Sequence, residues 1–144
     1  MRILGLDYGS KTVGVAISDE LLLTAQPVET IVRSGENKLR KTLARIEELI
    51  KENHVERIVL GLPLMTDDSI GDRAQLCMEF AEKLRTRTGL EVILVDERYT
   101  TTAAEEELEE MQIKRSEMKK YVDQLAACHI LEDYLHNQSF SNRA

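Results

Sequence analysis

The sequence predicts an α/β fold: a mixed five-stranded sheet, with three antiparallel strands followed by two parallel ones, flanked by helices. Two apolar, Ile- and Val-rich segments near the start are separated by only a few residues, which is typical of an antiparallel hairpin. Later apolar segments alternate with segments of helical periodicity, which implies parallel crossover connections. The 144 residues fit one domain at 1–138, with a polar tail at 139–144.

The first three strands are predicted from apolar and β-branched residues. Residues 1–7 are rich in Ile and Leu and predict a strand that is buried on both faces. A turn at Gly9 leads into T-V-G-V-A-I-S at 12–18, the second strand of the hairpin. A third extended segment at about 22–32 is interrupted by Pro27, which indicates an edge strand or a bulge.

The remainder of the chain alternates helices with short buried strands. Leu and Ile recur at helical spacing between Lys, Arg and Glu, and Gly or Pro closes several of the segments. The expected elements are a helix from 39 to about 53, a strand at 57–62, a helix from about 69 to 87 that ends at Gly89, a strand at 91–95, an acidic helix capped by Thr101 or Thr102, and a last helix capped by Ser116 that gives way to a frayed tail from Asn137.

Charge and composition narrow the class of protein. The net charge is −7, with 26 acidic against 19 basic residues, which argues against a general electrostatic attraction to nucleic acid but not against a local one. The opening M-R-I-L-G-L-D resembles neither an export signal nor a membrane span, so a cytoplasmic protein is expected. Cys77 and Cys128 are then expected to be reduced thiols that fill the core.

Acidic side chains occur where three of the predicted elements could meet. Asp7 ends the first strand, Asp96 and Glu97 directly follow the strand at 91–95, and Asp123 lies within the last helix. Because successive side chains of an extended chain diverge, one acid of the adjacent pair should line the site, and the longer Glu97 is the better candidate. Each position alone also has a structural interpretation: Asp7 as a turn acceptor, Asp96 paired with Arg98, Asp123 as a solvated helix residue.

Three converging carboxylates predict a divalent metal site. Like charges at close range repel one another, and a hard cation relieves that repulsion. Mg²⁺ or Mn²⁺ prefers oxygen ligands, and two such ions can activate water and stabilise the leaving oxygen of a phosphodiester. Zinc is not expected, because the histidines show no zinc-site spacing with the cysteines.

Basic residues near these acids could contact phosphate. Lys11 lies in the tip of the first hairpin, and several others surround the start of the last helix, whose free amides also attract phosphate. The candidates are Lys11, Arg73, Arg98, Lys114, Arg115, Lys119 and Lys120. Any single one of them could equally be an ordinary surface residue.

Four motifs occur in order along nearly the whole chain, from Ile3 to about Leu135. They are G-L-D-Y-G-S-K-T-V-G-V-A at 5–16, G-L-P-L at 61–64, D-E-R-Y-T-T at 96–101 and K-K-Y-V-D-Q-L-A-A at 119–127. With these motifs the chain resembles the YqgF family, also called RuvX-type, of Holliday-junction resolvases and pre-16S rRNA processing nucleases.

The resemblance implies a ribonuclease-H-like fold and metal-dependent cleavage of phosphodiester bonds with Mg²⁺ or Mn²⁺. It implies a nucleic-acid substrate, either the 5′ end of pre-16S rRNA during ribosome biogenesis or branched DNA, and a monomer or homodimer with no membrane partner. The family's acidic, metal-binding and catalytic positions fall on Asp7, Glu97 and Asp123. Its basic, substrate-binding positions fall on Lys11, Arg73 and Arg98.

Two positions depart from the family pattern. Asp68 stands where the family usually has Gly in the loop after G-L-P-L. Thr12 stands where the family often has Arg, which removes one possible phosphate contact.

Two other classes of protein remain open on the sequence alone. The Asp-x-Gly at the first hairpin also begins the phosphate loop of ATPases of the actin, Hsp70 and sugar-kinase class, but those need two related lobes and 144 residues supply one. The second is a non-catalytic RNA-binding or ribosome-assembly module. Carboxylates that cost stability without metal count against it, and replacing any one of them separates the two classes.

Overall fold

A computed structural model describes residues 1–9, 11–32, 39–63, 71–96 and 115–141. Within these residues the strands are β1 (Arg2–Tyr8), β2 (Thr12–Ser18), β3 (Ala25–Val32), β4 (Val55–Leu62) and β5 (Glu91–Asp96). The helices are α1 (Leu39–Asn53), α2 (Asp72–Thr88) and α4 (Arg115–Ser141). The acidic helix expected after Thr101 lies outside the described residues.

The five strands form one mixed sheet in the order β3-β2-β1-β4-β5. The first three strands pair antiparallel, β4 pairs parallel with β1, and β5 pairs parallel with β4. The predicted fold class, three antiparallel strands followed by two parallel ones with helices on the faces, is confirmed.

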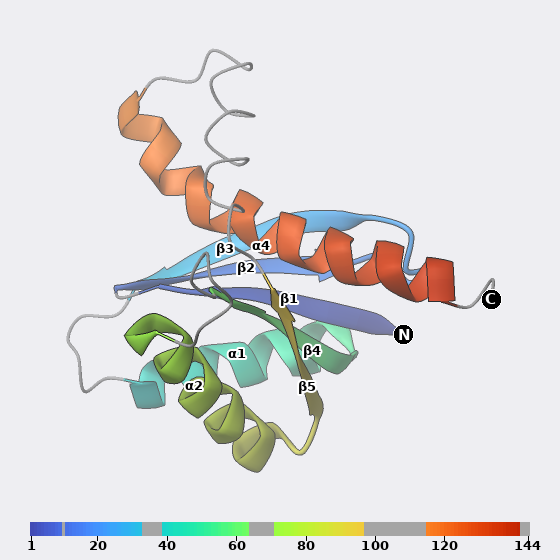
Figure 1. Cartoon of the computed structure of the whole chain (residues 1–144), viewed down its shortest axis with the longest axis horizontal. Coiled ribbons are helices and arrows are strands. Elements are labelled where there is room, and N and C mark those ends of the chain that lie inside the picture. Colours follow the sequence, from blue (N-terminus) through green and yellow to red (C-terminus); the bar gives the residue numbers. More distant parts are fainter. Residues whose placement is uncertain (10, 33–38, 64–70, 97–114, 142–144) are drawn as a thin grey trace.

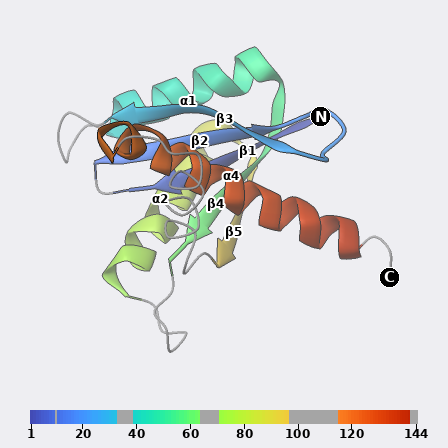
Figure 2. The same ribbon diagram turned by 90° about the horizontal axis from the view of Figure 1, so that it is seen from above.

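The helices cover both faces of the sheet, giving three layers (Figure 1). Helices α1 and α2 lie together on one face because both connections, β3 to β4 and β4 to β5, cross over in the same direction along the sheet. Helix α4 lies on the other face and contacts all five strands. Seen from above, it runs across the strands rather than along them (Figure 2).

Each face of the sheet has its own apolar core. On the α1/α2 face the side chains come from alternate positions of the strands, among them Leu4, Leu6 and Leu60, and pack against Phe80 of α2. On the α4 face the strands contribute smaller residues such as Ala16, which pack against Ala127 and its neighbours in the helix. The small side chains on this face let α4 approach the sheet closely.

Strand β3 is an edge strand, as Pro27 indicates. The register between β2 and β3 shifts between Val15 and Ala16, where Pro27 pairs opposite Ala16. Since proline has no amide hydrogen to donate, it is tolerated at such an edge irregularity.

The local sequence signals place most boundaries to within two residues. Gly89 ends α2 with a left-handed φ of 71°, as the sequence predicts. Strand β4 begins at Val55 rather than at residue 57, because Val55 is buried and pairs with Arg2 of β1. Helix α4 continues to Ser141, so the prediction of a frayed tail from Asn137 is wrong. None of the described helices is both long enough and apolar enough to span a membrane.

Candidate functional site

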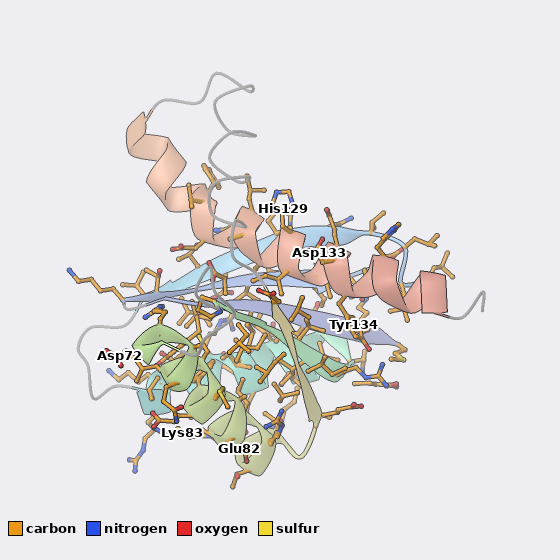
Figure 3. The ribbon with its side chains drawn as sticks, viewed as in Figure 1. Asp72, Glu82, Lys83, His129, Asp133 and Tyr134 are labelled. Carbon is orange, nitrogen blue, oxygen red and sulfur yellow. The ribbon has the colours of Figure 1, made fainter. Side chains whose placement is uncertain are left out.

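Asp7 lies near the carboxyl end of β1 on the face that α4 covers. Side chains alternate along the strand, so Leu6 enters the α1/α2 core whereas Gly5 and Asp7 face α4. Strands β1, β4 and β5 are parallel and end at the same edge of the sheet. Asp72, the first residue of α2, marks this end of the molecule in Figure 3. Ligand sites of α/β proteins commonly occupy this edge.

Helix α4 brings a second acid, Asp123, to the same place. Gly14 of β2 pairs directly with Asp7 of β1. A Cβ atom built on Gly14 would lie only 1.9 Å from the backbone carbonyl oxygen of Asp123. The helix backbone therefore rests on β2 at the position beside Asp7, and this contact is possible only because Gly14 has no side chain.

Two side-chain hydrogen bonds fix how α4 is rotated over the sheet. The Thr12 hydroxyl of β2 donates to Oδ2 of Asp123 at 2.6 Å. The next helix residue, Gln124, donates from Nε2 to Oγ1 of Thr30 in β3 at 3.2 Å. Further along the helix His129 extends away from the sheet, whereas Tyr134 lies on the sheet side (Figure 3).

The two carboxylates influence each other electrostatically. The pKa of Asp7 rises from 3.8 to about 6, mainly because burial disfavours its charge and also because the negative charge of Asp123 is close. The positive charge of Arg73 opposes this rise. Asp7 is thus a partly buried acid that would be more stable neutral, or paired with a cation.

Arg73 is anchored to the end of β1. Its Nη2 donates a hydrogen bond to the backbone carbonyl of Tyr8, and its guanidinium carbon lies 5.8 Å from the centroid of the Tyr8 ring. The Tyr8 ring in turn stacks on Phe80, with the ring centroids 4.1 Å apart. Arg73 therefore places a positive charge beside Asp7 and also ties α2 to the strand that carries it.

Cys77 lies below this end of the sheet and does not add a nucleophile. Burial raises the pKa of its thiol to about 11, with Arg73 acting against the rise and Asp7 adding to it. The thiol is protonated at neutral pH and packs as an apolar side chain. Cys77 and Cys128 are both buried thiols, as expected for core residues.

The structure describes only some of the other predicted site residues. Lys11 is exposed in the β1–β2 turn, two residues beyond Gly9, whose amide donates to the carbonyl of Thr12 at 2.7 Å. Asp96 ends β5 in register with Leu62, on the face opposite Asp7. Glu97 and Arg98 lie outside the described residues, as do Lys114 and the loop position 68. Arg115, Lys119 and Lys120 fall in the first turns of α4, where the side chains are not described.

The sequence did not single out Gly14, and it presented Thr12 only as a lost phosphate contact. Gly14 supplies the space in which α4 rests, and Thr12 holds the carboxylate of Asp123. A usable signal was present: a small residue stands in the middle of a β-branched strand, and small residues recur at 126 and 127 in the helix.

The pair of carboxylates fits a divalent cation that prefers oxygen ligands. Two acids whose charges repel at a partly buried strand end gain most from a shared cation, and carboxylate oxygens are the ligands that Mg²⁺ and Mn²⁺ prefer. Among the described residues no cluster of three His, Cys, Asp or Glu side chains occurs. The described part of the chain thus supplies two of the three predicted ligands.

The raised pKa of Asp7 predicts how the stability of the metal-free protein depends on pH. The folded state holds the Asp7 proton up to about pH 6 and the unfolded state only up to about 3.8. The proton bound to Asp7 in the folded state therefore adds to the free energy of unfolding at pH 4. This contribution, about 3 kcal/mol at most, is lost as the pH rises through 6. Urea denaturation of wild type and Asp7→Asn in EDTA across pH 4–7.5 measures this contribution, because the variant has no titrating carboxyl group at position 7. A constant difference between the two proteins would contradict it.

The mixed sheet with helices on both faces has the ribonuclease-H-like fold. Its structure is similar to that of Thermus thermophilus RuvC in complex with a Holliday junction substrate, with a TM-score of 0.60 and 15% identity over 97% of this chain and 96% of that one. It is also similar to the fowlpox virus Holliday junction resolvase, with a TM-score of 0.57 and 14% identity over 96% of this chain and 99% of that one. At these identities the similarity concerns the fold.

The chain belongs to the RuvX family. The family model, described as "Holliday junction resolvase", matches residues 1–137. A protein of Lachnospira eligens named "Putative pre-16S rRNA nuclease" is 56% identical over 96% of this chain and 99% of its own length. A protein of the same name from Agathobacter rectalis is 56% identical over 94% of each chain. The family is one of nucleases, which are hydrolases of phosphodiester bonds.

Proposed function

We propose that this chain is a metal-dependent nuclease that processes the 5′ end of pre-16S rRNA during ribosome biogenesis. The observation that carries the proposal is the pairing of Asp7 with Asp123, which α4 brings against the end of β1 through the space at Gly14. A scaffold would gain nothing from two acids that repel each other at a partly buried site. The names of relatives 56% identical to this chain support the RNA substrate.

In this proposal, Asp7, Asp123 and Glu97 hold the metal ions, Mg²⁺ or Mn²⁺. Asp7, at the end of β1, would hold the ions together with Asp123 and Glu97, whose carboxylate oxygens are the ligands that such cations prefer. When bound, the ions supply activation of the attacking water and stabilisation of charge on the phosphate.

The basic residues of the chain would orient the substrate. Lys11, exposed at the hairpin tip, and Arg98 would contact phosphate oxygens near the scissile bond. Arg73 already bonds to the carbonyl of Tyr8 and lies close enough to Asp7 to affect its pKa. Its main role would be to fix the strand that carries Asp7, with phosphate contact as an additional role.

Cleavage assays on two substrates test the proposal. A labelled 5′ fragment of pre-16S rRNA and a four-way DNA junction are each incubated with wild type in Mg²⁺, in Mn²⁺ and in EDTA. We expect cleavage of the RNA fragment that requires the metal and that Asp123→Asn abolishes. Asp133→Asn is the matched control, because Asp133 is an exposed acid of the same helix, away from the described site, and it should cleave like wild type.

The resolvase description of the family favours branched DNA as the second candidate substrate. Metal-dependent cleavage of the junction and not of the RNA would support that candidate. If neither substrate is cleaved while both still bind, the protein is a nucleic-acid-binding module and the proposal is wrong.

A further inference from the structure

Thr12 connects the first hairpin to the acid of the last helix, 111 residues further along the chain. Its hydroxyl donates to Oδ2 of Asp123 at 2.6 Å, in a partly buried setting. A hydrogen bond of this length to a charged carboxylate is among the stronger ones that a neutral side chain makes. The contact therefore constrains the orientation of the carboxylate as well as the position of the helix.

The backbone of Thr12, which carries this hydroxyl, is itself held from two sides. Its backbone carbonyl accepts a hydrogen bond from the Gly9 amide at 2.7 Å, which closes the hairpin turn. Thr12 also pairs with Val32 of β3, so its backbone is held by the turn on one side and by β3 on the other. Because Thr is β-branched, its side chain has few rotamers open to it once the backbone is fixed. The donor that Asp123 meets is thus already oriented by the sheet.

The hydrogen bond from Thr12 to one oxygen of the Asp123 carboxylate should make it easier for that carboxylate to bind a metal ion. The bond to Oδ2 selects one rotamer of Asp123 and leaves Oδ1 free of this donor. A carboxylate held in one orientation loses less conformational entropy when it binds an ion.

We propose that Thr12 is a positioning residue that holds the Asp123 carboxylate in the orientation that binds the divalent cation. The proposal rests on the proposed function, since it assumes that Asp123 is a metal ligand. Thr12 acts through Asp123 and need not touch the substrate. The hydroxyl at position 12 thereby has a role of its own, distinct from the phosphate contact that an Arg at this position would make.

Metal titration of two variants tests the role. Thr12→Val keeps the shape of the side chain and removes the donor, whereas Thr12→Ser keeps the donor. Mn²⁺ binding is measured by calorimetry and by the loss of the free-ion signal in electron paramagnetic resonance. We expect Thr12→Val to bind Mn²⁺ about 10- to 100-fold more weakly, and Thr12→Ser to stay close to wild type. Thermal unfolding in EDTA establishes that both variants are folded.

Cleavage kinetics provide a second measurement. With Thr12→Val, the cleavage rate should approach that of wild type at saturating Mn²⁺, with KM for the nucleic acid unchanged. A raised KM at saturating Mn²⁺ would instead indicate a direct substrate contact and overturn the positioning role. Equal Mn²⁺ affinity of wild type and Thr12→Val would also overturn it. Failure of wild type itself to bind Mn²⁺ would contradict the proposed function, which is a separate outcome.

Discussion

Asp7→Asn should abolish cleavage and at the same time make the metal-free protein more stable. Asn has the shape of Asp but no charge, so the variant loses a proposed metal ligand. Removing several kcal/mol of transition-state stabilisation corresponds to at least about a thousandfold lower rate. The same change relieves the burial of a charge and its repulsion by Asp123, the two causes of the raised pKa. At pH 7.5 in EDTA the gain in the free energy of unfolding should be up to about 3 kcal/mol.

Urea denaturation at pH 7.5, once with EDTA and once with Mg²⁺, measures the stability of the metal-free protein and the stability that the metal adds. Mg²⁺ should raise the stability of wild type, because an ion that binds only the folded state stabilises it, and should leave Asp7→Asn unchanged. Asp133→Asn again serves as the control and should follow wild type in both conditions. An Asp7→Asn protein that cleaves normally, or that is less stable than wild type in EDTA, would contradict the assignment of Asp7 to a strained metal site.

Gly14→Ala should lower both stability and activity, although Gly14 has no side chain that could bind metal or substrate. The added Cβ would lie 1.9 Å from the carbonyl oxygen and 2.3 Å from the carbonyl carbon of Asp123. Backbone atoms cannot rotate away, so α4 has to move off the sheet. Overpacking of this kind costs about 3 kcal/mol. Displacing Asp123 by about 1 Å from Asp7 should reduce the cleavage rate about 100-fold.

The matched control is Gly89→Ala at the end of α2. Nothing lies within 4 Å of a Cβ built there, but φ is +71°, so the cost is backbone strain of about 1 kcal/mol without a steric clash. This variant should cleave like wild type. Urea denaturation gives the two stabilities, and cleavage is measured well below the unfolding midpoint. A Gly14→Ala protein with wild-type stability and rate would show that α4 does not rest on β2 as described.

The secondary structure of this protein was predictable because its signals are local. Alternation and β-branching in residues 12–18, Pro27 at an edge and Gly89 after a helix each act through the backbone of their own segment. One boundary error arose where a distant segment decides, and another at the end of the last helix. Strand β4 gains Val55 because β1 offers a partner at Arg2, and α4 extends to Ser141 beyond the polar residue at which the sequence suggested an end.

The sequence alone determined the order of the elements, the family and the acids worth considering. It identified Asp7 and Asp123 as candidates, but each had an ordinary structural interpretation. Only the tertiary structure decided that Gly14 lets α4 rest on the sheet beside Asp7, and that Thr12 orients Asp123. The physical reason is that burial and Coulomb interaction depend on distances through space between residues more than a hundred positions apart, which no local pattern encodes.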